Sequence, residues 1–132
     1  MPAVIGQPAP EFELRDQNKK LMSLDDLQGK KALIVFIPFP FTGICDAEGC
    51  AIRDGLGQLE NLDANVVVIT AHAVQTNAAW ASQNDFTFPI LSDFWPHGVV
   101  SDAYGTFNPD LGVAMRSSYV LDEGGIVREI IA

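Results

Sequence analysis

Short apolar runs and polar turns alternate along the chain and divide it into predicted strands and helices. In residues 12–24, apolar positions alternate with charged ones around a polar turn at 16–18, which predicts a hairpin. Uninterrupted apolar runs at 32–37 and 66–69 contain β-branched residues, and each predicts a strand buried on both faces. The stretch 45–62, between these two runs, is predicted to form a helix.

The second half of the chain predicts more short elements of both kinds. They are a helix at 76–85 with the Thr76 hydroxyl as its cap, a strand at 88–91, a helix at 98–104, and a final hairpin of strands at 115–122 and 126–131. Strands that alternate with helices and end in a hairpin predict an α/β fold of the thioredoxin-like type, with a mixed central sheet flanked by helices. No repeat or linker interrupts the pattern, so residues 1–132 are interpreted as a single domain.

Composition and charge exclude several classes of protein. With 132 residues, 48% of them hydrophobic, the chain can bury a core without disulfides. Eight lysines and arginines against 17 acidic residues, a net charge of −9, leave no basic patch for nucleic acid or anionic lipid. The longest apolar stretch, 32–41, is interrupted by prolines and is shorter than the ~18 residues that cross a bilayer. No signal peptide is recognisable at the start, so we expect a cytoplasmic protein that does not bind membranes.

The two cysteines, Cys45 and Cys50, are separated by four residues. This C-x4-C spacing differs from the C-x2-C of zinc sites, and no further cysteine or histidine follows at ligand spacing, so we predict no metal site. A structural disulfide framework is not expected in a cytosolic chain. Three interpretations stay open at this point: a redox pair, one reactive thiol, or two inert thiols.

Cys45 lies where a thiol can be activated, because it follows a predicted buried strand and opens a predicted helix. The unpaired N–H groups of a first helical turn and the helix dipole stabilise a thiolate at that end. Thr42 can place its hydroxyl within hydrogen-bond reach of the sulfur, and Pro38 stiffens the approach from the strand. These features favour a reactive Cys45 over an inert one.

Local charge opposes this activation. Asp46 and Glu48 are carboxylates next to the sulfur, and like charges disfavour a thiolate. A cation must therefore come from elsewhere in the chain. We predict that it is Arg116, which lies at the start of an apolar strand and is either exposed at an edge or directed into a pocket.

The pattern Pro38-x-x-x-Thr42-x-x-Cys45 resembles the active-site motif of the peroxiredoxin family. Further stretches that resemble this family are 7–12 (Gln-Pro-Ala-Pro-Glu-Phe) and 86–93 (Phe-Thr-Phe-Pro-Ile-Leu-Ser-Asp). Residues 41–45 and 92–98 are similar to its alkyl hydroperoxide reductase E-type subgroup. The resemblance covers essentially the whole chain and implies a thioredoxin-like fold, a peroxidatic role for Cys45, and active-site roles for Arg116, Pro38 and Thr42.

The implied activity is a thiol-dependent peroxidase that reduces hydrogen peroxide and organic hydroperoxides. A Cys45 thiolate attacks the peroxide and becomes a sulfenic acid, while the Arg116 guanidinium, the Cys45 N–H and the Thr42 hydroxyl meet the shifting charge. No cofactor is required. The resemblance also implies a thioredoxin-like protein or a low-molecular-weight thiol as reductant and a homodimer. Phe39, Phe41 and Trp95 are candidates for the walls of the pocket or of the dimer face.

The role of Cys50 depends on helix geometry. In an intact helix, five residues separate two Cα atoms by roughly 8–9 Å, whereas a disulfide needs less than ~7 Å. The helix can open, because Gly49, Gly55 and Gly57 each weaken it, and Cys50 is predicted on an accessible face away from Cys45. The spacing also resembles Q-type peroxiredoxins, in which a thiol five residues on resolves the sulfenic acid. A resolving Cys50 and a bystander Cys50 both stay open.

Other functions and one departure from the family pattern complete the prediction. A thiol–disulfide oxidoreductase usually carries C-x2-C, but here Glu48 stands three residues after Cys45. A non-catalytic thioredoxin-like binding or chaperone module is an alternative, and a copper chaperone of C-x3-C type is a remote one.

His72 and His97 are interpreted as structural. The resemblance implies one more helix of about twenty residues after the last strand, and the printed chain ends without it.

Overall fold

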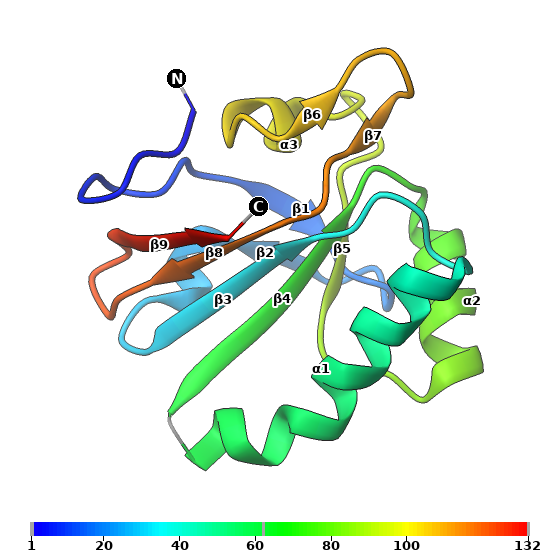
Figure 1. Ribbon diagram of the computed structural model, residues 1–132, viewed down its shortest axis with the longest axis horizontal. Helices are drawn as coiled ribbons and strands as arrows, with labels where there is room; N and C mark the ends of the chain where they lie inside the picture. Colours follow the sequence, from blue (N-terminus) through cyan, green and yellow to red (C-terminus); the bar gives the residue numbers. More distant parts are fainter. Residues whose placement is uncertain (1, 62, 132) are drawn as a thin grey trace.

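A mixed sheet of seven strands, ordered β2-β1-β5-β4-β3-β8-β9, runs through the computed structural model, which describes residues 2–61 and 63–131 (Figure 1). The strands are β1 (Glu13–Arg15), β2 (Leu21–Ser23), β3 (Lys31–Phe36), β4 (Ala64–Thr70), β5 (Ile90–Ser92), β8 (Ser117–Leu121) and β9 (Val127–Ile131), with β6 (Phe107–Asn108) and β7 (Val113–Ala114) forming a separate pair. The helices are η1 (Leu24–Leu27), α1 (Gly43–Asn61), α2 (Val74–Asn84) and α3 (Val99–Ala103). The predicted mixed α/β sheet flanked by helices is confirmed.

Strand pairing brings distant parts of the chain to one edge of the sheet. β3 pairs in parallel with β4, β4 pairs in parallel with β5, and the carboxyl ends of all three lie at the same edge. β8 runs antiparallel to β3, with Ser117 opposite Phe36, so the start of β8 lies beside the end of β3. Arg116 therefore stands next to the loop that leads from β3 into α1.

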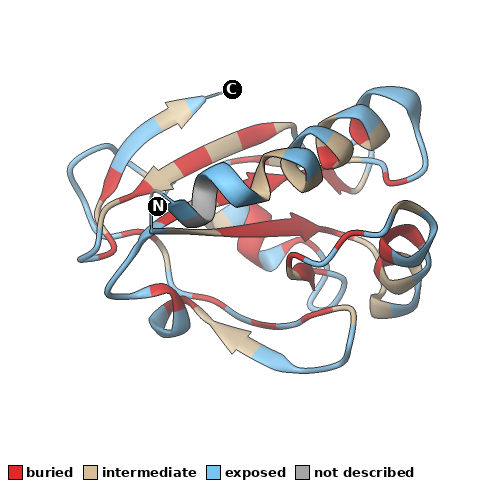
Figure 2. Cartoon of the chain, turned by 90° about the horizontal axis from the view of Figure 1, so that it is seen from below, coloured by how far each residue is buried: buried red, intermediate tan, exposed pale blue. Residues whose placement is uncertain are grey.

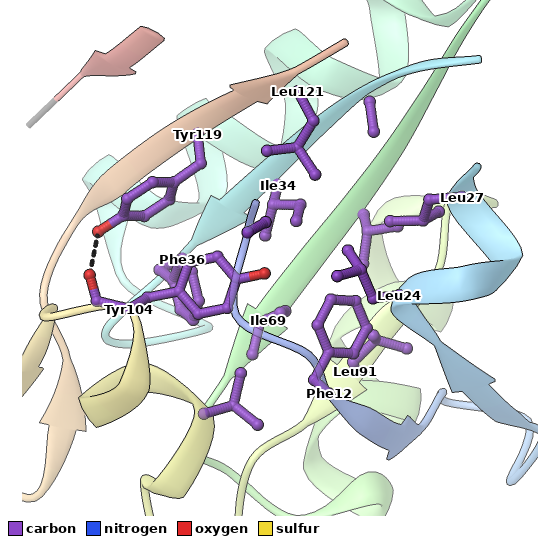
Figure 3. Packing of buried hydrophobic residues seen from close by; sticks show 14 of the residues in the cluster. Phe12, Leu24, Leu27, Ile34, Phe36, Ile69, Leu91, Tyr104, Tyr119 and Leu121 are labelled. Atoms are coloured by element: carbon purple, nitrogen blue, oxygen red, sulfur yellow. Dashed lines mark hydrogen bonds between the residues drawn. The ribbon is translucent and has the colours of Figure 1, made fainter. Parts of the chain in front are cut away.

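Each face of the sheet has its own apolar cluster. On one face, Phe36, Tyr104 and Tyr119 meet with ring centroids 5.2–5.6 Å apart, and the Tyr119 hydroxyl donates to the Tyr104 carbonyl (Figure 3). On the other face, α1 and α2 cover the sheet, and Cys45 and Trp80 belong to this second cluster. The central strands carry most of the burial, while the outward sides of the helices are exposed (Figure 2).

The sequence predicts the strands of the large sheet and the three α-helices, with small shifts at the ends, but not η1 or the pair β6–β7. The first hairpin, the strands β3 and β4, the three α-helices and the final hairpin are confirmed. The predicted cap at Thr76 is wrong: α2 begins two residues earlier, with Ala73 at its N-cap and no side-chain cap. The strand predicted at 88–91 begins only at Ile90, since the preceding Pro89 has no N–H to donate. The predicted helix end at residue 62 lies outside the described residues.

Candidate active site

Cys45 is buried at the start of α1, in the loop-to-helix junction that follows β3. Only 1% of the residue is exposed, and it packs in the apolar cluster beneath α1 and α2. Where the helix begins, the Asp46 N–H donates to the Thr42 carbonyl at 2.7 Å. The sulfur therefore lies in a buried site close to the positive end of a 19-residue helix. In general a helix N-terminus stabilises a thiolate and burial opposes it, so a cation beside the sulfur matters.

Arg116 brings a positive charge to this sulfur. Its Nη2 lies 3.0 Å from Cys45 Sγ, and its Nη1 donates to the Glu48 carboxylate. Burial alone would lower the pKa of Arg116, but its hydrogen bond to Cys45 and the charges of Cys45 and Glu48 outweigh burial and raise that pKa. The guanidinium is thus held between a sulfur and a carboxylate of the same helix, with its planar fork fixed by both.

The two carboxylates that were expected to oppose a thiolate are each engaged by hydrogen-bond donors. Glu48 is paired with Arg116. Asp46 turns toward α2, where its Oδ1 accepts the Trp80 indole N–H at 2.7 Å and the Phe41 backbone N–H at 3.1 Å. Their negative charge is therefore partly offset locally, and the guanidinium is the charged group in direct contact with the sulfur.

Thr42 and Pro38 lie in the loop before α1, and the hydrogen bond of Thr42 differs from the one expected. The Thr42 hydroxyl donates to the Phe39 carbonyl at 2.7 Å. Its one proton is thereby used, and among the described residues the expected hydrogen bond to the sulfur is not made. Pro38 is half-buried, and its carbonyl accepts from His72 Nε2 at 3.0 Å. His72 thus ties the end of β4 to the active-site loop.

Cys50 lies one turn further along α1 and is half-buried rather than on a separate accessible face. Its sulfur packs against the cluster that contains Cys45 and lies 4.0 Å from Asn84 Oδ1. The prediction of an accessible face for Cys50 is wrong because the C-terminal end of α2 covers that side of α1, where the Arg53 guanidinium also donates to the Asn84 carbonyl at 2.7 Å. Both cysteines are free thiols, and α1 is helical between them.

The sequence analysis missed the contribution of Trp80. Its indole is fully buried and reaches from α2 to Asp46 on α1, where its N–H donates to the carboxylate. An apolar residue inside a helix gives no sign of which polar group it will meet. His97 was interpreted as structural, and it lies with Nδ1 3.0 Å from the Phe94 carbonyl and Nε2 2.7 Å from the Gly112 carbonyl.

Residues 2–61 and 63–131 contain neither a cluster of metal-binding side chains nor a membrane-spanning helix. No three histidine, cysteine or acidic side chains gather closely enough there to hold a metal ion. Within the same ranges, no helix combines the length and apolar character needed to cross a membrane.

A buried thiol at a helix N-terminus, after a central strand and under an arginine, defines a thiol enzyme of the thioredoxin-like class. Comparison with known proteins gives the family. The AhpC/TSA family matches residues 5–130. The chain is 49% identical over 125 residues to alkyl hydroperoxide reductase E of Mycobacterium tuberculosis. The aligned region covers 94% of this chain and 82% of that protein.

Two further likenesses agree. The chain is 33% identical over 132 residues to the chloroplastic peroxiredoxin Q of Populus jackii, covering 95% of this chain and 58% of that protein. The crystal structure of peroxidoxin BcpB from Mycobacterium tuberculosis superimposes with a TM-score of 0.90 and 28% identity, covering 98% of this chain and 86% of that one. The chain belongs to the AhpC/TSA family and is a thiol-dependent peroxidase of the peroxiredoxin type, with a thioredoxin-like fold.

Proposed function

We propose that Cys45 is the peroxidatic thiol of this enzyme. The observation that carries the proposal is the 3.0 Å contact between Arg116 Nη2 and Cys45 Sγ in a buried site at a helix N-terminus. The thiolate attacks one peroxide oxygen, the O–O bond breaks, and the sulfur becomes a sulfenic acid. The departing oxygen takes up a proton and leaves as water or as an alcohol.

Arg116, Thr42 and Pro38 support this step. Negative charge moves from the sulfur to the departing oxygen, and the guanidinium beside the sulfur meets it without reorganisation. The Thr42 hydroxyl donates its hydrogen bond to the Phe39 carbonyl. The lone pairs of its oxygen stay free to accept a hydrogen bond from the O–H of a hydroperoxide. Pro38 presents no N–H to the pocket and holds the loop through its carbonyl contact with His72.

Hydrogen peroxide and organic hydroperoxides are the proposed substrates. The loop before Cys45 and the first turn of α1 carry exposed apolar side chains at Phe39, Phe41 and Ile44, and these suit the alkyl part of an organic hydroperoxide. The similarity to a protein named alkyl hydroperoxide reductase supports the same choice.

Cys50 is the proposed resolving thiol. Once the first turns of α1 unwind, its thiolate attacks the Cys45 sulfenic acid, a disulfide forms, and hydroxide leaves as water after taking up a proton. A thioredoxin-like dithiol or a low-molecular-weight thiol then reduces the disulfide. The 33% identity to a peroxiredoxin Q supports this role.

A homodimer and a cytoplasmic location complete the proposal. Phe94 and Trp95, 50% and 81% exposed, lie near the carboxyl end of β5 at the edge that also holds the active-site loop. Apolar side chains exposed to this degree are typical of interfaces, and we propose a second copy of the chain as the occupant. The cytoplasm, where thiols are kept reduced, supplies the electrons that the cycle needs.

Stopped-flow peroxide reduction by wild type, Cys45→Ser and Cys50→Ser tests the proposal. Cys45→Ser should abolish the reaction, whereas Cys50→Ser should keep the first step and lose the disulfide. Mass spectrometry after one equivalent of peroxide should show a loss of 2 Da in the wild type. A sulfenic acid that persists with Cys50 free would reject Cys50 as the resolving thiol. Insulin reduction without peroxide consumption would favour a thiol–disulfide oxidoreductase instead.

A further inference from the structure

One carboxylate oxygen joins three segments at the start of α1. Asp46 Oδ1 accepts the Trp80 indole N–H at 2.7 Å and the Phe41 N–H at 3.1 Å. Trp80 comes from α2 and is fully buried, and Phe41 belongs to the loop before α1. The residue next to Cys45 is therefore fixed both to the neighbouring helix and to the active-site loop.

Trp80 also covers the next turn of α1. A Cβ atom added at Gly49 would lie 3.2 Å from Trp80 Cζ2 and 2.6 Å from Phe86 Cζ, so the helix approaches both rings closely there. The indole thus lies along α1 from residue 46 to residue 49, which is the segment between the two cysteines. Phe86 supports it edge-on, with ring centroids 5.0 Å apart.

The loop residue Phe41 has a conformation that needs such support. Its φ of 70° lies in the left-handed region, which residues other than glycine seldom adopt. Its N–H donates to Asp46, so the hydrogen bond that holds the helix start also holds this loop conformation. Loss of the Asp46 carboxylate frees both at once.

We propose that Asp46 and Trp80 form a latch that keeps the first turns of α1 wound and sets the rate at which oxidised Cys45 reaches Cys50. The disulfide requires unwinding, because an intact helix holds the two Cα atoms roughly 8–9 Å apart and a disulfide spans less than ~7 Å. The two latch residues are positioning residues that act through the helix and not on the peroxide. This inference rests on the proposed resolving role of Cys50.

The latch predicts different effects on the two chemical steps. Attack on peroxide uses the wound state, which stays the main population when the latch is weakened. Disulfide formation uses the unwound state. Weakening the latch raises the equilibrium constant for unwinding, and the population of the unwound state rises by the same factor. Losing a hydrogen bond to a charged group changes such an equilibrium constant by a factor of about ten or more. Disulfide formation should therefore become about tenfold faster. In Trp80→Phe, which keeps the carboxylate beside Cys45, the peroxide step should change by less than about twofold.

Two variants remove the latch from opposite sides. Trp80→Phe keeps an aromatic ring in the core and the carboxylate beside Cys45, but it lacks the N–H donor. Asp46→Ala removes the acceptor. Asp54→Ala is the matched control, since Asp54 is an exposed carboxylate on the same helix whose hydrogen bond comes from its neighbour Arg53. Because Asp46 and Trp80 share one hydrogen bond, the accelerations caused by the two substitutions should combine less than additively in free energy in the double variant.

Amide hydrogen exchange of residues 43–49 tests the latch without Cys50. In a Cys50→Ser background, both latch variants should exchange about tenfold faster over these residues, and Asp54→Ala should match the wild type. With both cysteines present, stopped-flow and quenched mass spectrometry then measure the sulfenic acid and the disulfide as separate rate constants.

The outcomes separate the two proposals. Faster exchange with faster disulfide formation supports the latch. Faster exchange with no disulfide in any variant supports the latch at the helix start and rejects Cys50 as the resolving thiol. Unchanged exchange in both latch variants overturns the latch, whatever the disulfide does. A fall in both rate constants together with a general rise in exchange across the sheet also overturns it, because Asp46 and Trp80 would then serve only overall stability.

Discussion

Arg116 Nη2 lies 3.0 Å from Cys45 Sγ, although 71 residues separate the two in the chain. The antiparallel pairing of β8 with β3, with Ser117 opposite Phe36, brings them together. The site thus consists of a helix start and a strand start joined across the central sheet.

Replacement of Arg116 should show how much the guanidinium contributes. Arg116→Met should lower the second-order rate constant for peroxide by about 10²–10³, the usual effect of removing a fixed donor from a developing charge. Arg116→Lys should be intermediate, because one ammonium group cannot reproduce the planar fork that reaches both the sulfur and Glu48. Stopped-flow measurement at one pH checks both. Arg128→Met is the control, since Arg128 is exposed and paired with Asp122; an equal loss there would contradict the prediction.

Glu48 can either orient Arg116 or oppose the Cys45 thiolate. Whether replacing Glu48 lowers or raises the rate constant for peroxide separates these two roles. Because its carboxylate accepts from Arg116 Nη1, we expect Glu48→Ala to lower the peroxide rate constant about tenfold. Glu48→Gln should recover much of this loss, since its amide oxygen still accepts that hydrogen bond. A rise in rate in both variants would show that the negative charge matters more than orientation.

Two glycines of α1 should respond in opposite directions to the same substitution. Gly49→Ala should lower the free energy of unfolding by about 1–3 kcal/mol, because the new Cβ would lie 2.6 Å from Phe86 Cζ. Gly55→Ala, where a Cβ would meet nothing within 4 Å, should raise it by about 0.5–1 kcal/mol through helix propensity. Urea unfolding of both variants measures the difference, and a stabilised Gly49→Ala would show that α1 does not approach α2 as described.

Buried Asp93 should make stability depend on pH. Burial raises its pKa above the ordinary 3.8, and the hydrogen bonds from Val100 and Ser101 and the charge of His97 only partly oppose this. The folded state therefore holds the proton more tightly than the unfolded state. The contribution of Asp93 to stability is present below pH 3.8 and is lost as the pH rises through its folded pKa.

Unfolding measured from pH 3.5 to 7 in wild type and Asp93→Asn isolates this effect. The stability of the wild type minus that of the variant should fall as the pH rises just above 3.8 and then stay level. A difference that rises with pH over the same interval would mean that the three hydrogen bonds to the carboxylate outweigh its burial.

Local patterns sufficed to predict the sheet, because its strands are uninterrupted apolar runs or alternating hairpins. They also indicated Cys45 and the need for a distant cation. The sequence could not tell where side chains on neighbouring helices would meet. Cys50 was expected on an accessible face and lies under Asn84, and the Asp46 carboxylate was expected to oppose a thiolate but pairs with Trp80. Both depend on how α2 lies on α1, which one helix at a time does not specify.

The long separation between Cys45 and Arg116 also matters while the protein is being made. A ribosome that adds ~5–20 residues per second needs roughly 4–14 s to pass from the one to the other. During that interval the emerging thiol has no guanidinium beside it, and β8 has not yet joined β3. The acceleration that Arg116 gives to Cys45 therefore begins only once β8 has paired with β3, and until then the emerging chain has the reactivity of an ordinary thiol.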